Sequence, residues 1–172
     1  MNLRLQKLFN KVETQRKTLL LSLNSLSNEM LNDHPPGKWS INQIIAHLIT
    51  AENLSIRYLN KKILGVNEVK DTGIVEELKI LLLVASQRLP LKFKAPKVVV
   101  DQTSKETDFN KLTEEWDKVR GELKGLLDRI EDRHLKRKIY KHVRVGMLNI
   151  QHALKFLGEH VGHHAPQIKR LA

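Results

Sequence analysis

The chain contains no cysteine among its 172 residues. This absence excludes disulfide bonds, thiolate metal ligands and a cysteine nucleophile, so a bound metal must be held by histidine, carboxylate, backbone or water. Long apolar runs are also missing, because the longest, residues 80–85, is far shorter than the roughly 18 residues that span a membrane. Residues 1–10 lack the apolar centre of a signal peptide. We therefore expect a soluble, cytoplasmic chain with no membrane partner.

Aromatic residues make up only 5% of the chain, and no platform for stacking nucleic-acid bases is visible. The net charge is nevertheless +11, and cations are densest between Arg133 and Arg144. A basic surface gains affinity for polyanions by releasing counterions, which makes nucleic acid a possible partner. We favour the simpler interpretation of this segment, a solvated basic connector.

Apolar residues recur at spacings of three and four over most of the chain, as in amphipathic helices. The pattern predicts long helices over 3–31, 40–62, from 108 or 113 to 130, and 147–171, with a shorter helix over 74–89. We expect a loop at 65–73, a short extended piece at 98–100 and the basic connector at 134–146. The predicted fold is all-α: a four-helix bundle with an extra short helix and long connectors, forming a single domain over residues 1–172.

Local signals support two of these helices. Ser40 and Gln43 have the spacing of a capping box, which predicts a helix start at residue 40. The 74–89 helix carries Leu78, Leu81, Leu82 and Ala85 as its apolar positions, and residues 80–85 are expected to form a buried patch.

The final predicted helix carries the strongest chemical signal. One stripe along it consists of Ile150, Ala153, Leu157, His160, His164, Gln167 and Leu171. His160 and His164 therefore lie one turn apart on the face expected to meet the core, where two imidazoles can bind one ion. A third imidazole is available from His47, which lies on the apolar stripe of the second long helix. Three imidazoles leave coordination positions open, as in catalytic zinc sites.

The pattern of these histidines also fits structural roles without a metal. His47 taken alone fits a hydrogen-bonded core residue, and His160, His163 and His164 fit a solvated polar patch. His163 points about a quarter-turn away from His164, which suggests a supporting or surface position. The remaining histidines lie in loops or off the stripe and are read as structural: His34, His134, His142 and His152.

Two segments resemble the DinB-like superfamily, also called the YfiT-like metal-dependent hydrolases. Residues 39–48, Trp-Ser-Ile-Asn-Gln-Ile-Ile-Ala-His-Leu, are similar to the second-helix signature of that family. Residues 146–150, 156–160 and 163–168 are similar to its last helix. Only these segments are specific, but their order and separation extend the resemblance over nearly the whole chain.

The resemblance implies a four-helix bundle with one metal ligand from the second helix and two from the last. These positions fall on His47, His160 and His164, the same trio that the stripes select. It also implies zinc or nickel as the metal, a low-molecular-weight thiol as a cosubstrate in some members, and a homodimer. Pro166 departs from the expected helix, because proline removes a hydrogen bond and tends to kink a helix, which could displace His164.

The leading hypothesis is a metal-dependent enzyme acting on a small molecule, either a hydrolase or a low-molecular-weight-thiol S-transferase. Glu52 and Glu159 are the nearest acidic candidates for proton transfer, although a surface role fits both better. Gln167, one turn past His164, is expected near a bound ligand or behind a metal ligand. Two alternatives remain: a non-catalytic stress-related binding protein that uses the bundle pocket or basic surface, and a structural domain whose histidines satisfy one another.

Overall fold

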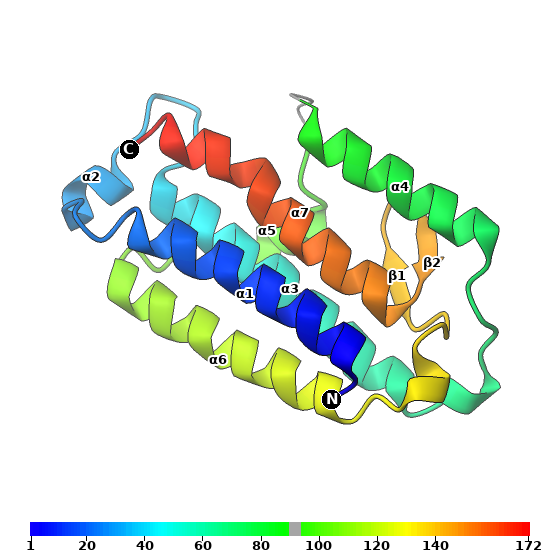
Figure 1. Ribbon diagram of the computed structural model, residues 1–172. Coiled ribbons are helices and arrows are strands. Elements are labelled where there is room, and N and C mark those ends of the chain that lie inside the picture. The colour runs from blue at the N-terminus through cyan, green and yellow to red at the C-terminus, as the bar shows by residue number, and fades with distance from the viewer. Residues whose placement is uncertain (90–93) are drawn as a thin grey trace.

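The computed structural model describes residues 1–89 and 94–172. Four long helices form the predicted bundle: α1 (Leu3–Leu21), α3 (Ile41–Ile63), α6 (Phe109–Asp128) and α7 (Ile150–Lys169). In Figure 1, α1 and α7 run in one direction, and α3 and α6 run in the other. Because the neighbours α3 and α6 are parallel, the chain between them must return along the bundle. That return contains η1 (Val66–Glu68), α4 (Ile74–Arg88) and α5 (Lys97–Gln102).

The bundle core is mainly aliphatic and is closed by contacts of α1 with α7 and of α3 with α6. Trp116, Leu5 and Ile44 are among its largest fully buried side chains. Within the described part of the chain, no helix combines the length and apolarity needed to cross a membrane.

The expected capping box at the start of α3 is confirmed. The Gln43 amide donates to Ser40 Oγ at 3.2 Å, and the Gln43 side chain accepts from the Ser40 amide at 2.9 Å. Side chains also cap the other bundle helices, since Asn2, Asp108 and Asn149 accept from the first turns of α1, α6 and α7. The cap at Asp108 selects the earlier of the two predicted starts for α6.

The single helix predicted over residues 3–31 is wrong, because two helices occupy this range. α1 ends at Leu21, and α2 (Asn28–Asn32) begins after Ser27, whose hydroxyl accepts from the Met30 amide. Ser22 Oγ donates to the Leu19 carbonyl at 2.7 Å. Residues 22–27 contain four serine or asparagine residues, and such side chains compete with helical hydrogen bonds.

Two other local predictions are wrong. Residues 98–100 are not extended but lie in α5, which packs on α3, and none of the described residues forms a strand beside it. Tertiary contacts there outweigh the strand preference of three valines. The apolar face assigned to α4 is solvent-exposed: Leu78, Leu81 and Leu82 are 55%, 64% and 69% exposed, and Ala85 is exposed as well. Because α4 lies outside the bundle against α7, only a narrow stripe with Ile80 and Leu83 is buried.

The segment expected as a basic connector is largely ordered. It contains η2 (Asp132–His134) and an antiparallel hairpin of β1 (Tyr140–His142) and β2 (Gly146–Leu148), with His142 paired to Gly146. α7 therefore starts at Ile150 rather than 147. Part of the positive charge is used within the fold, since Lys138 pairs with Glu76 at 3.0 Å and Arg137 with Asp71 at 3.4 Å. The hairpin packs on α3 and places its buried side chains beside the bundle.

Candidate metal centre

The structure brings together the three histidines that the sequence selects. His47 lies on α3, and His160 and His164 lie one turn apart on α7. One ring nitrogen from each lies within 4.8 Å of the others. The Nε2 atoms of His47 and His160 are 3.3 Å apart, and the three ring centroids are 5.0–5.2 Å apart. Pro166 lies inside α7, but the helix continues to Lys169 and the cluster remains closed.

Burial keeps these imidazoles neutral. It lowers the pKa of His47 to about 4, with a further contribution from His164, and lowers the pKa of His164 to about 4. The pKa of His160 falls well below its usual range through burial and through its histidine neighbours. Neutral imidazoles carry the lone pairs that a metal needs.

Contacts around the cluster orient two of the rings. The Nδ1 atom of His164 lies 3.1 Å from Gln167 Oε1, which can accept its proton and leave the Nε2 lone pair available. Phe156 stacks on His160 with centroids 5.4 Å apart and planes at 14°. The Nδ1 atom of His47 is buried without a hydrogen-bond partner in the described residues. A set of three converging neutral nitrogens, held from two helices, fits a borderline cation such as zinc or nickel.

The cluster forms one wall of a pocket of about 760 Å³. Apolar and aromatic side chains provide much of the remaining wall, with Trp39 lying 5.1 Å from the His47 ring, centroid to centroid. Other walls come from α5, through Val98, Val99 and Val100, and from the hairpin. A metal held by these three histidines would therefore be accessible to a small molecule in the pocket.

Sequence reasoning missed His142. The sequence predicts a structural residue in a loop or off the stripe, but β1 places His142 in the pocket lining, buried and with its ring 4.6 Å from the Phe156 ring, centroid to centroid. Burial lowers its pKa to about 4, and the Arg144 cation contributes. The signal was the alternation Tyr140-Lys141-His142 followed by Gly146, which adopts a φ of 77° at the end of the turn. A strand of three residues gives too short an alternation to be read from sequence.

The other histidines have separate positions. His163 lines the same pocket, and its Nδ1 atom lies 2.8 Å from the Gln87 carbonyl, which links α7 to α4. His134 lies 2.9 Å from Asn67 Oδ1, His152 lies 2.9 Å from Glu77 Oε1, and His34 is exposed. These last three fit the structural roles expected of them.

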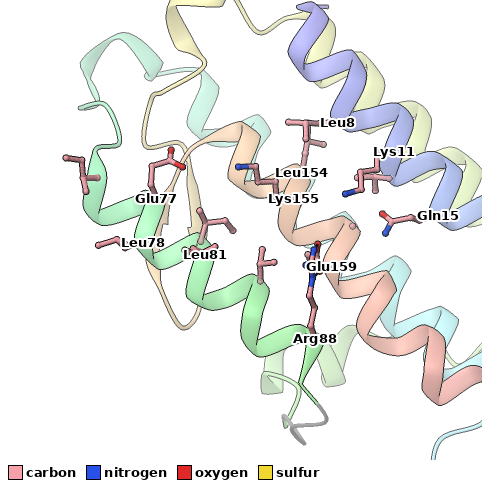
Figure 2. A pocket seen from close by; sticks show the side chains of 15 residues that line it. Leu8, Lys11, Gln15, Glu77, Leu78, Leu81, Arg88, Leu154, Lys155 and Glu159 are labelled. Atoms are coloured by element: carbon pink, nitrogen blue, oxygen red, sulfur yellow. Dashed lines mark hydrogen bonds and ion pairs between the residues drawn. The ribbon is translucent and has the colours of Figure 1, made fainter.

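Neither acidic candidate lines the pocket. Glu52 points into the core, where Oε1 pairs with Arg120 Nε at 2.8 Å and Oε2 accepts from Trp116 Nε1 at 3.0 Å. Burial raises the pKa of Glu52, and Arg120 and Trp116 oppose that shift. Glu159 pairs with Arg88 at 2.7 Å in a different groove of about 600 Å³ between α1, α4 and α7 (Figure 2). No histidine occurs among the described residues that line this second groove.

The sequence profile of the DinB superfamily matches residues 11–168. Comparison with curated protein sequences gave no significant match. Among solved structures, the fold is similar to that of YfiT from Bacillus subtilis, described as a probable metal-dependent hydrolase with an unusual four-helix bundle topology. The two chains are 18% identical, and their TM-score is 0.59 over 96% of this chain and 84% of YfiT. At that identity the likeness shows a shared fold.

Proposed function

Because the chain belongs to the DinB superfamily, we propose that it is a divalent-metal-dependent enzyme acting on a small molecule in the pocket beside His47, His160 and His164. The observation that carries this proposal is the convergence of three neutral imidazole nitrogens, from two helices far apart in sequence, at the wall of an open pocket. The printed description of YfiT as a probable metal-dependent hydrolase supports the same class of activity.

Zinc or nickel held by this trio would supply Lewis acidity to a nucleophile, either water in a hydrolase or a low-molecular-weight thiol in an S-transferase. The chain's own side chains hold the site in shape. Gln167 accepts from His164 and fixes its tautomer, and stacked Phe156 restrains the His160 ring. Trp39 and Val99 exclude water from part of the pocket.

Proton transfer in this pocket cannot use a carboxylate of the described lining residues, since none is present there. Glu52 is held in the core by Arg120, and Glu159 is held by Arg88. His142 is a further titratable ring in the pocket lining, and its Nδ1 atom accepts from the Arg144 amide at 3.3 Å. That tautomer leaves a proton on Nε2, so we assign His142 the role of a hydrogen-bond donor to bound substrate.

The first test is elemental analysis of untagged protein purified without chelator, together with His47→Ala, His160→Ala and the exposed control His34→Ala. We expect near-stoichiometric zinc or nickel in the wild type and the control, and loss in the two pocket variants. Circular dichroism checks that those variants remain helical. No metal in the wild type after incubation with zinc or nickel overturns the proposal. Metal without turnover of activated esters, or of electrophiles with added thiol, indicates the non-catalytic binding role.

We also propose a homodimer through α4. Its exposed face consists of Ile74, Val75, Leu78, Leu81 and Leu82. These side chains form one arc of the helix, opposite the stripe that packs on α7, and Leu78 and Leu81 border the groove in Figure 2. Their exposed area is on the order of 600 Å², at the upper end for a patch on a monomer. It also approaches the roughly 800 Å² that each partner contributes to a stable interface.

Sedimentation equilibrium tests the dimer. Leu81→Glu should shift the protein to monomer, whereas Leu64→Glu, at an even more exposed leucine outside this face, should leave the dimer intact. A wild-type monomer at 100 µM, or a dimer unaffected by Leu81→Glu, contradicts this assignment.

A further inference from the structure

The pocket beside the histidines has a one-sided charge. Four cationic residues line it, from the turn before α3, the segment before α5 and the hairpin: Lys38, Lys94, Lys141 and Arg144. No aspartate or glutamate occurs among its lining residues in the described part of the chain, although the whole chain has 19. None of the ion pairs found among described residues involves Lys38, Lys94 or Lys141.

The second groove shows that this bias is local and does not simply follow from the net charge of +11. It has a comparable volume and an apolar floor, but Glu77 and Glu159 stand beside its cations in Figure 2. Arg88 there is neutralised by Glu159, with nitrogen–oxygen distances of 2.7 and 2.8 Å. A basic chain can thus form a groove of mixed charge. The described lining of the pocket at the histidines carries cations without any carboxylate.

The rest of the pocket wall is apolar. Trp39, Phe156 and Val99 lie on three different segments around it, so a bound molecule would bury carbon there. Cations at the mouth of an apolar cleft concentrate the positive potential, because the low-dielectric walls screen it poorly. A divalent cation held by the histidines would add to this potential. A neutral or cationic molecule gains nothing from it, whereas an anion does.

We propose that the substrate of this pocket is an organic anion, an apolar body carrying a carboxylate or phosphate group; this rests on the function proposed above. The body lies against Trp39, Phe156 and Val99. The charged group is bound by the cations at the mouth, with Lys38 and Lys141 as the specificity-determining pair. These lysines come from segments about 100 residues apart, so their shared pocket is a property of the fold.

The test uses metal-free protein, prepared with a chelator, so that direct coordination of the probe to a metal is excluded. Isothermal titration compares 4-phenylbutyrate with its neutral amide and with 4-phenylbutylamine, three molecules of nearly equal apolar surface. Phenyl phosphate forms a further arm that compares phosphate with carboxylate. We expect an anion to bind at least about tenfold more tightly than the amide, with no measurable binding of the amine, and affinity to fall as salt rises.

The variant Lys38→Gln/Lys141→Gln should lose most of the preference for the anion. The control Lys61→Gln/Lys124→Gln makes the same change in net charge on α3 and α6, away from the pocket, and should retain the preference. The proposal is overturned if the amide binds as tightly as the anions or if no anion binds at millimolar concentration. It is also overturned if the control variant loses as much of the preference for the anion as the pocket variant does. Anion preference in a protein that fails to load metal would reject the enzymatic proposal and leave a pocket that binds organic anions without turnover.

Discussion

Removing the Arg120 side chain should destabilise the fold more than removing the whole Glu52–Arg120 ion pair. Both side chains are 3% exposed, and the pair joins α3 to α6 at 2.8 Å. In Arg120→Met, the Glu52 carboxylate keeps only the bond from Trp116. An uncompensated buried charge of this kind typically costs about 3–5 kcal/mol. For a chain of this size, that loss lowers the melting temperature on the order of 10 °C.

The double variant Glu52→Leu/Arg120→Met should be considerably more stable than Arg120→Met alone. The Nη1 and Nη2 atoms of Arg120 are buried without hydrogen-bond partners in the described residues, so the native pair is incompletely satisfied. Apolar replacements of similar size remove both desolvation costs together. The buried Trp116 Nε1 then loses its acceptor, at a cost of about 1–3 kcal/mol that is smaller than the cost of an unpaired buried charge. The double-mutant cycle, measured by urea denaturation at pH 7, gives the coupling directly.

The pH dependence provides a second signature. Burial raises the pKa of Glu52, and loss of Arg120 removes the main opposing influence. A carboxyl whose pKa is higher in the folded state than in the unfolded state contributes its full stabilisation at low pH, and this stabilisation is lost as the pH rises. The destabilisation by Arg120→Met should therefore be smaller at pH 5 than at pH 8. A loss below about 1 kcal/mol, far under the cost of an unpaired buried charge, would refute this reasoning. A penalty independent of pH, or a double variant as unstable as the sum of the singles, would refute it too.

Three further predictions concern the metal-free protein. Burial lowers the pKa values of His47, His142 and His164 to about 4, so their stabilising contribution is complete above pH 6.5 and is lost as pH falls toward 4. Each of these three histidines should lower the free energy of unfolding by up to about 1.4 kcal/mol per pH unit as the pH falls through that window. A melting temperature that stays flat from pH 7 to 4.5 contradicts this. Ser40→Ala removes the cap of α3 and should cost about 0.5–2 kcal/mol in urea denaturation, while Ser25→Ala, at an exposed serine in the turn between α1 and α2, serves as the control. Gly158→Leu should cost about 1–3 kcal/mol by overpacking, because a Cβ added there would lie 3.3 Å from Val12 Cγ2 and 2.7 Å from Gln15 Oε1. An unchanged melting temperature counts against that close α1–α7 contact.

Several features of this protein follow from the sequence because they depend on neighbouring residues. The periodic apolar positions define α3, α4 and α6 closely, and the Ser40–Gln43 capping box starts α3 where expected. The spacing of His160 and His164 places them one turn apart wherever α7 lies, since helix geometry alone fixes it. The stripe containing His47, together with the family resemblance, was enough to select the third member of the cluster.

Where the sequence misled, a tertiary contact competed with a local preference. Valines 98–100 favour a strand but are packed as a helix on α3. The leucines of α4 suggest a buried face, yet α4 lies outside the bundle and exposes them. The break between α1 and α2 shows the opposite case, in which serine and asparagine side chains outweighed an apolar pattern that continues through Leu23, Leu26 and Met30.

The chemistry of the pocket depended on the tertiary structure still more strongly. Distances between histidine rings, the burial that keeps them neutral and the hairpin that brings in His142 all require the packing of α3, α7 and β1. Glu52 could not be separated from the pocket by sequence, because only packing shows that its carboxylate faces Arg120. The sequence determines which residues share a helix face, since that depends on a few backbone angles. Which faces meet, and which charges are left around a pocket, depends on the free energy of the whole chain.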